Sequence, residues 1–466
     1  MGRLWTLVGV VVLALAAVSL AACGGNDGDE EGGGAGNEAG PTAASGPVSI
    51  DFWHSETAAN ETALQRLVDR FNASQDQVRV RPLYQGNVHD LILKLVNSLP
   101  SGNVPAIVEL VEANVQIAVD SGGITPVQEF LDAEGYDLSD FDEKLVEYYT
   151  VDGNLYAMPW AVSVPMLLYN KIPFREVGLD PDKPPLTLDD VRGYSEKLLK
   201  VDSAGNVVRN GLALDTDPWW LEVTLAAHGD LYLNNNNGRD GRPTEVLFNG
   251  PTGQAFFRWW DEMIDSDLAF NVGRNLSGAD ALMAVAAGRA AMAFSSSSVL
   301  RSVFGVLEAG VEGVELGVGP FPGLPGGTNE PGVGSRSLWI MNKRSDAEQQ
   351  AAWQFVRWLA EPEQQAELFA GTGNLPARIS AYDLEPSRQV LEEHPEYQVP
   401  VDSFVGVPST PAKLGPRMGP FSMVSDIVAE AIEEMVVGGK DPVQALDDAA
   451  ERATKELQDY NQRVGE

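Results

Sequence analysis

The order of apolar residues over residues 48–119 constrains the fold of this chain more than any other feature. Short β-type runs alternate there with segments whose apolar residues recur at helical spacing. The β-type runs are residues 48–53, 78–84 and 106–111, and the helical segments are residues 64–71, 91–96 and 115–119. Such alternation is typical of α/β proteins with a largely parallel sheet. We therefore expect a β-α-β-α-β unit at the start of the folded region, near Val48.

The chain is long enough to bury a large core. Its 466 residues are 44% hydrophobic and include 10 Trp, 16 Phe and 11 Tyr. This content excludes a disordered chain and a small disulfide-stapled protein. At about 150 residues per domain, the length predicts two or three lobes.

Two capping boxes and one polar run mark local structure. Residues 187–190 (Thr-Leu-Asp-Asp) and 345–348 (Ser-Asp-Ala-Glu) are each expected to begin a helix. The run Asn234–Gly241 lacks the ligand spacing and the closing Glu of a calcium loop. It is predicted to be an Asx-rich hairpin loop instead.

The N-terminal segment predicts the cellular location. Arg3 precedes an apolar run over residues 4–20, and small residues lead into Cys23. This pattern is typical of a lipoprotein signal peptide over residues 1–23 that ends in a lipobox, with an uncleaved signal anchor as the alternative. Residues 24–46 hold Gly, Ala, Asp and Glu and no large apolar side chain, so we expect a flexible tether. We expect Cys23 to carry a lipid at the outer face of the cell membrane, and as the only cysteine it leaves none for a disulfide or metal site.

Charge excludes a nucleic-acid partner. The sequence has 32 Lys and Arg against 67 Asp and Glu, a formal net charge of −35. Such a chain repels phosphate backbones and anionic lipid headgroups. Membrane contact is therefore expected only through the lipid anchor.

Motifs for catalysis and metal binding are missing from the sequence. The Walker A, H-E-x-x-H and G-x-S-x-G patterns do not occur, and the four histidines lack the spacing of metal ligands. We therefore expect no catalytic residue, metal or cofactor. The many carboxylates still leave a secreted glycoside hydrolase with paired carboxylates as an alternative.

Six segments carry a resemblance to a known family. They are Phe52-Trp53-His54-Ser55, Gln85-Gly86-Asn87, Ser101-Gly102-Asn103-Val104-Pro105-Ala106-Ile107, Met158-Pro159-Trp160 with Leu168-Tyr169-Asn170-Lys171, Ser337-Leu338-Trp339-Ile340-Met341 and Thr372-Gly373-Asn374-Leu375-Pro376. In this order they resemble the family 1 extracellular solute-binding proteins of carbohydrate-type ABC importers. The similarity is strongest to the branch that binds glycerol 3-phosphate and glycerophosphodiesters, and it runs from Val48 nearly to the C-terminus.

The resemblance implies an α/β fold of the two-lobe periplasmic-binding-protein type, type II-like, with the ligand in a cleft between the lobes. Lobe 1 would hold residues 47–158 and 334–377, and lobe 2 residues 159–333 and 378–466. The implied function is that of a noncatalytic, monomeric binding component. It would capture a carbohydrate, polyol or glycerophosphodiester and deliver it to the subunits of an ABC permease.

The resemblance also implies ligand-binding residues. Glu112, Ser163 and Ser296 match polar ligand contacts of the branch, and Glu112 follows a buried strand, where open α/β sheets bind ligands. Other positions depart from the pattern, with Val88 and Asn374 where the branch has Tyr and Ser335 where it has Gly. The phosphate-contacting Arg of the branch is replaced by Ser425, which leaves Arg336 and Arg417 as substitutes. The final list of polar candidates is Glu112, Ser163, Ser296, Ser335, Asn374, Arg336 and Arg417.

Tryptophans supply the expected stacking surface for a sugar ring or polyol. Trp219 and Trp220, at an expected helix start, are the first candidates, and Trp53 and Trp160, at strand ends, come second. The helical Trp259, Trp260, Trp353 and Trp358 are predicted to lie in the core.

Overall fold

A computed structural model describes residues 46–465 of the chain, except 275–278, 311, 331 and 333. The predicted signal peptide with Cys23, and all but the last residue of the predicted tether, lie outside the described residues. Pro47–Glu466 forms one compact unit by itself.

The first sheet contains the predicted β-α-β-α-β unit. Its strands run in the order β15-β7-β14-β3-β1-β2, with β4 paired to β14. Pairing of β1 with β2 and with β3 is parallel, as the alternating pattern predicts, and β14 runs antiparallel to β3 and β7. The strands are β1 Val48–His54, β2 Val78–Tyr84, β3 Ile107–Val111, β4 Ile124–Thr125, β7 Met158–Ser163, β14 Gly334–Met341 and β15 Leu375–Pro376.

Helices between these strands follow the predicted apolar spacing. Helix α1 buries Leu64, Leu67, Val68 and Phe71 against the sheet. The helices around the first sheet are α1 Ala58–Ser74, α2 Val88–Ser98, α3 Val115–Asp120, α4 Val127–Glu134, α5 Glu143–Tyr149, α13 Asp346–Leu359 and α14 Pro362–Thr372. The small hairpin of β5 Thr150–Val151 and β6 Asn154–Leu155 follows α5.

A second sheet has the order β11-β10-β12-β8-β13, with β9 paired to β10. Its strands are β8 Pro165–Asn170, β9 Lys200–Val201, β10 Val207–Asp215, β11 Ala269–Gly273, β12 Ala290–Ser296 and β13 Leu316–Pro320. The remaining helices are α6 Lys171–Glu176, α7 Leu188–Leu198, α8 Trp219–His228, α9 Asn234–Gly238, α10 Pro251–Asp265, α11 Ala279–Ala286, α12 Leu300–Glu308, α15 Glu385–Glu393, α16 Gln398–Phe404, α17 Phe421–Val436 and α18 Pro442–Gly465. Short 3-10 turns lie at Leu99–Ser101, Glu112–Asn114, Ser297–Val299, Ile379–Asp383 and Pro395–Tyr397.

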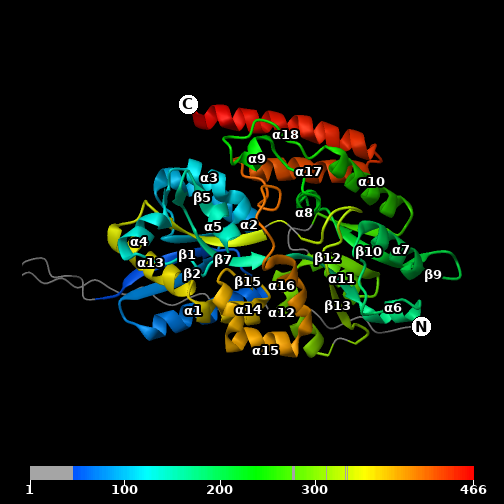
Figure 1. Cartoon of the computed structure of the whole chain (residues 1–466), viewed down its shortest axis with the longest axis horizontal. Coiled ribbons are helices and arrows are strands. Elements are labelled where there is room, and N and C mark those ends of the chain that lie inside the picture. Colours follow the sequence, from blue (N-terminus) through cyan, green and yellow to red (C-terminus); the bar gives the residue numbers. More distant parts are fainter. Residues whose placement is uncertain (1–45, 275–278, 311, 331, 333, 466) are drawn as a thin grey trace, which may run out of the picture. The chain divides into compact units, whose positions relative to one another are not determined.

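The two sheets lie in two halves of the compact unit, each with its own apolar core. Figure 1 shows the strands of the first sheet at the left and those of the second, in green, at the right. The chain passes from the first sheet to the second at Val164 and returns into β14 at Gly334. Pairing with β14 keeps β7 in the first sheet as far as Ser163, whereas the predicted lobe 1 segment ends at 158.

The residues after 377 do not all pack with the second half of the molecule. Helix α15 packs on α14, and α16 packs on β13, so residues 385–404 contact both halves. Helices α17 and α18 pack with the second core. All of the lobe boundaries stay a prediction.

The two predicted helix starts and the predicted hairpin loop are confirmed. Thr187 with Asp190 and Ser345 with Glu348 form reciprocal capping boxes at the starts of α7 and α13. In the segment labelled α9, Asn235–Asn237 all have left-handed backbone conformations, with φ of 52°, 58° and 55°. A bridge between Leu233 and Val246 closes this segment, so it is an Asx-rich hairpin loop rather than a right-handed helix.

In the described part of the chain, every helix is too short or too polar to cross a membrane.

Candidate ligand-binding site

The site begins where β3 ends beside the first residues of β14. Glu112 follows β3 directly, and the backbone N–H of Ser335 donates a hydrogen bond to Glu112 Oε2 at 2.8 Å. The Ser335 hydroxyl and the Tyr149 hydroxyl share a hydrogen bond of 2.6 Å. These contacts fix the carboxylate of Glu112 at the carboxyl end of a strand, as predicted.

Gly334 lets the second half of the molecule approach this point. A Cβ added at Gly334 would lie 2.7 Å from the Ser163 carbonyl oxygen and 2.8 Å from a ring carbon of Trp219. A side chain at this position would therefore clash with both. We call Glu112, Ser163, Trp219, Gly334 and Ser335 the crossing cluster, because they meet where the chain crosses between the sheets.

Buried carboxyl groups dominate the electrostatics of the cluster. Burial raises the pKa of Glu112 to about 7, although the hydrogen bond from Ser335 opposes the shift. On helix α8, burial and the charges of Glu112 and Asp217 hold the pKa of Glu222 well above its usual range. Burial also raises the pKa of Asp217, although its hydrogen bond from the Trp219 N–H opposes this. Acidic groups from both halves therefore meet at the crossing cluster.

Arg336 is already engaged by carboxylates. Its Nη1 lies 2.7 Å from Glu56 Oε1 and 3.6 Å from Glu109 Oε2, and it donates a hydrogen bond to the Ser55 hydroxyl at 3.2 Å. Both glutamate side chains are almost fully buried. The structure therefore places this guanidinium in an ion-pair cluster rather than toward a phosphate.

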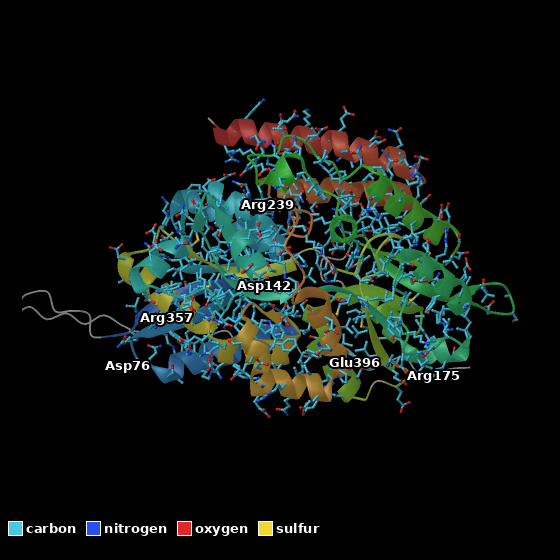
Figure 2. All side chains as sticks on the ribbon, in the orientation of Figure 1. Asp76, Asp142, Arg175, Arg239, Arg357 and Glu396 are labelled. Atoms are coloured by element: carbon cyan, nitrogen blue, oxygen red, sulfur yellow. The ribbon has the colours of Figure 1, made fainter. Side chains whose placement is uncertain are left out.

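Arg417 is engaged by backbone carbonyls. Its guanidinium donates to the Gly238 carbonyl oxygen at 3.2 and 3.0 Å and to the Thr150 carbonyl oxygen at 3.2 Å. The neighbouring Arg239, labelled in Figure 2, donates to the Gly415 carbonyl oxygen at 2.7 Å and lies over the Tyr148 ring. These contacts fasten the Asn-rich loop to the chain around it, which is a structural role for Arg417.

Ser296 and Asn374 lie in segments that border the crossing. Ser296 shares a hydrogen bond of 2.7 Å with Ser298, and between them Ser297 exchanges hydrogen bonds with Val164, the residue after Ser163. Gly373 approaches the Ser297 carbonyl closely, which brings Asn374 into the same region. Asn374 is buried and hydrogen-bonds Thr372. Ser425, at the position of the branch's Arg, lies on α17 and is half-buried.

The two adjacent tryptophans of α8 have different roles. Trp219 is half-buried and lies against Gly334. Trp220 is 3% exposed, stacks on Phe321 at 5.7 Å and donates its Nε1–H to Asp215. The structure thus corrects the expected pair, because Trp220 packs inside the second core and only Trp219 remains available for stacking.

The other tryptophans pack in the cores. Trp160 is 2% exposed and donates a 3.1 Å hydrogen bond to Glu109 Oε1, so its indole is not a stacking surface as it was expected to be. Trp53 is half-buried and packs against the first core. Trp259, Trp260 and Trp353 are buried and Trp358 packs at the edge of the first core, as predicted.

Sequence reasoning missed the groups that support the cluster. Tyr148 and Tyr149 look like the apolar face of an ordinary helix, and nothing in their spacing shows that their hydroxyls bind Pro416 and Ser335. Glu109 did carry a signal, because it is the one charged residue in the otherwise apolar β3 run. A charge in a buried strand needs a partner, but the sequence does not show that the partner is Arg336.

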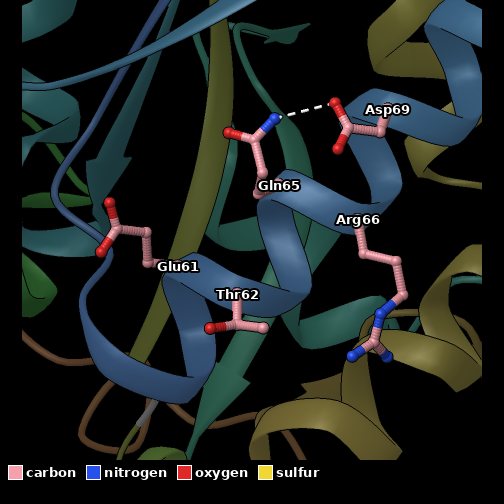
Figure 3. Close-up of a pocket in the computed structure, with 5 residues that line it drawn as sticks. All are labelled: Glu61, Thr62, Gln65, Arg66 and Asp69. Atoms are coloured by element: carbon pink, nitrogen blue, oxygen red, sulfur yellow. Dashed lines mark hydrogen bonds between the residues drawn. The ribbon is translucent and has the colours of Figure 1, made fainter.

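Two surface depressions lie outside the crossing cluster. Figure 3 shows one on the exposed face of α1, where Glu61, Thr62, Gln65, Arg66 and Asp69 project and Gln65 donates to Asp69 at 2.9 Å. The other lies between α12 and α15 and includes His394. Neither is lined by a residue of the crossing cluster. Among the described residues, no group of three or more His, Cys, Asp or Glu is placed to hold a metal ion.

Comparison with known proteins identifies the family. Residues 66–398 match the family described as bacterial extracellular solute-binding protein. The chain belongs to this family. The predicted role as the solute-binding component of an ABC importer is confirmed at this level, and so is the two-lobe α/β fold class.

Relatives and solved structures agree with this assignment. The sn-glycerol-3-phosphate-binding periplasmic protein UgpB of Pectobacterium atrosepticum is 30% identical over 425 residues, which cover 90% of this chain and 93% of the relative. UgpB from Mycobacterium tuberculosis in complex with glycerophosphocholine has a TM-score of 0.74 at 21% identity, covering 90% of this chain and 100% of that one. The cyclic alpha-maltosyl-1,6-maltose binding protein from Arthrobacter globiformis has a TM-score of 0.70 at 25% identity, covering 89% and 100%.

Proposed function

We propose that this protein captures a zwitterionic glycerophosphodiester at the crossing cluster and presents it unchanged to an ABC permease. One observation carries the proposal: Glu112, Asp217 and Glu222 gather around Trp219, while Arg336 and Arg417 are engaged elsewhere. A similar protein was solved in complex with glycerophosphocholine, a zwitterionic diester, which supports this ligand class.

The acidic side of the site suits the cationic end of such a ligand. A quaternary ammonium is attracted both by carboxylates and by the face of an indole, and the attraction grows as water leaves. Among the described residues, the Glu222 carboxyl group has no hydrogen-bond or ion-pair partner. A bound cation would therefore stabilise its ionised form against the burial that raises its pKa. The hydroxyls of Ser163 and Ser296 and the amide of Asn374 would meet the glycerol part.

A neutral saccharide or polyol is the second candidate. Trp219 offers a stacking face for a sugar ring, and Glu112 can accept hydrogen bonds from two neighbouring hydroxyls. The similarity to a cyclic maltosyl-maltose binding protein favours this candidate.

We also propose that the chain is not an enzyme. Glu112 and Glu222 come from opposite halves and are near enough for the charge of Glu112 to raise the pKa of Glu222, and a glycosidase also uses a pair of neighbouring carboxyl groups. The relatives, however, are named for binding. Incubation with maltose and with glycerophosphocholine, followed by chromatography, tests this: the ligand should return intact, and release of glucose, choline or glycerol would contradict it.

A phosphate monoester should bind poorly. At a net charge of −35 the protein repels an anion, and the carboxylates of the cluster repel it at short range. Glycerol 3-phosphate should therefore bind at least about tenfold more weakly than the preferred ligand, a difference of about 1.4 kcal/mol.

Calorimetry with glycerophosphocholine, glycerol 3-phosphate and a disaccharide panel measures this order. Glu222→Gln should weaken glycerophosphocholine more than any disaccharide, whereas Glu451→Gln, an exposed control on α18, should change neither. Tightest binding of glycerol 3-phosphate would overturn the proposal, and tightest binding of a disaccharide would favour the second candidate.

A further inference from the structure

The side chains of the first residues of β14 make contacts on both faces of the first sheet. On one face Ser335 contacts Tyr149, and on the other Arg336 reaches Ser55 and Glu56 in the turn after β1. The pairing of β14 with β7 is irregular between Arg336 and Ser337. The residue without a partner there is Trp160 of β7, and such an irregularity changes where neighbouring side chains and N–H groups point.

An anchor of charged side chains joins four segments of the chain. Arg336 on β14 pairs with Glu56, and Glu109 on β3 accepts hydrogen bonds from the Ser55 N–H at 3.3 Å and from Trp160 on β7 at 3.1 Å. Glu56 and Glu109 have side-chain exposures of 5% and 1%. Removing one partner from a buried charge cluster of this kind strongly destabilises the fold, because a buried charge is left unpaired.

One guanidinium serves two carboxyl groups, so the cluster is neutral only when one carboxyl keeps its proton. Burial, and then the charge of Glu56, raise the pKa of Glu109 to about 8, which makes Glu109 the protonated member. The other ionisable groups that face this cluster are Glu112, which acts on Arg336, and His54 and Glu61. Burial lowers the pKa of His54, which keeps its imidazole neutral.

We propose that Arg336 is a positioning residue for ligand binding: anchored by Glu56 and Glu109, it fixes the start of β14 so that the Ser335 amide holds the Glu112 carboxylate at the ligand. The proposal rests on the crossing cluster being the ligand site. Its role in positioning replaces the direct phosphate contact expected from the sequence.

Two consequences can be measured. Without the anchor, the Ser335 N–H should leave Glu112 more often and exchange faster with solvent. When Glu109 ionises, the buried cluster gains an uncompensated negative charge, so ligand affinity should fall as the pH rises from 7.5 to 9. The glutamine of Glu109→Gln imitates the protonated carboxyl and should remove this fall. Glu112, with a pKa of about 7, completes its ionisation in the lower part of this range, so the comparison with Glu109→Gln, which keeps Glu112, isolates the part of the change that is due to Glu109.

Amide hydrogen exchange is the test that needs no ligand. In Arg336→Met the Ser335 amide should exchange at least tenfold faster at constant pH, while the amide of Leu212, on β10 in the second core, keeps its rate. Arg336→Lys should recover most of the protection, and circular dichroism checks that each variant folds. An unchanged Ser335 rate in Arg336→Met would overturn the proposal. If Arg336→Met does not fold, the exchange rate of the Ser335 amide in Arg336→Lys and in Glu109→Gln tests the proposal instead.

Calorimetry with glycerophosphocholine and maltose across pH 7.5–9 is the second test. Wild type should lose affinity by at least threefold and Glu109→Gln by less than 1.5-fold. A parallel loss in both proteins would overturn the role of Glu109. If wild type binds neither probe, the proposed function fails for these ligands, and the exchange of the Ser335 amide still decides whether Arg336 positions β14.

Discussion

Neighbouring residues of this protein can have opposite roles, and α8 shows it. Trp219 and Trp220 differ by one position, yet a rotation of about 100° along the helix puts the first at the crossing cluster and the second in the core. The sequence alone predicts the same role for both, because two identical adjacent side chains do not show which of them faces the core.

Substituting these tryptophans one at a time should separate binding from stability. Trp219→Ala is expected to weaken binding of glycerophosphocholine or maltose at least tenfold with a small change in melting temperature. Trp220→Ala is expected to cost about 3–5 kcal/mol of unfolding free energy, because it leaves a cavity in the second core. Calorimetry and chemical denaturation measure the two effects. Equal effects of both substitutions on binding would contradict the division.

A second prediction at this scale concerns pH. The pKa of Glu109 is about 8 in the folded protein, above its ordinary value near 4.5, and burial is the main cause. The unfolded chain therefore releases this proton first. The stabilising effect is complete below about pH 4.5 and is lost as the pH rises toward 8.

Glu109→Gln should therefore show a smaller fall in melting temperature between pH 6.5 and 8.5 than wild type. Asp261→Asn is a suitable control, because its carboxyl lies on α10, away from the anchor cluster. Identical pH profiles for wild type and Glu109→Gln would show that Glu109 is ionised in the folded protein.

At the scale of elements, the sequence predicted best those features that depend on residues within one element, such as apolar periodicity and helix caps. The strands and helices from β1 to α3, and the capping boxes of α7 and α13, follow from residues within one element. The contacts of Arg336 do not, because Glu56 and Glu109 lie more than 200 positions away in the chain. The apolar β3 run predicts a strand, but only its neighbours show what its single Glu binds.

The Asn-rich loop also links elements of the two halves. Arg242, just after it, forms a bidentate ion pair with Asp120 of α3 at 2.9 and 2.6 Å, and Tyr460 of α18 donates to the same carboxylate at 2.9 Å. Asp120 is 6% exposed and Arg242 is 41% exposed, so solvent weakens the pair to about 1 kcal/mol or less.

Asp120→Asn should release bound ligand up to about fivefold faster, because these contacts join the two halves on which the proposed ligand site depends. Stopped-flow tryptophan fluorescence with glycerophosphocholine measures the rate. Asp426→Asn, which breaks an ion pair with Arg274 outside the first sheet and its helices, is the matched control. The same release rate in both variants would mean that the contacts of Asp120 do not help to retain the ligand.

At the scale of the whole molecule, Pro47–Glu466 is compact without any residue of the predicted signal peptide. The proposed lipid on Cys23 should therefore be needed for location and not for folding. Cys23→Ala should move the protein from the membrane fraction to the soluble fraction with an unchanged melting temperature and ligand affinity. Mass spectrometry of the wild-type N-terminus should find a lipid, and an unmodified Cys23 would refute the lipobox.

The bare backbone at Gly334 also has a consequence for engineering. A single methyl group there would clash with both Ser163 and Trp219, at the point where the two halves are in contact. Gly334→Ala should therefore push Trp219 away from the start of β14, so that one added carbon atom changes how the second half meets the first.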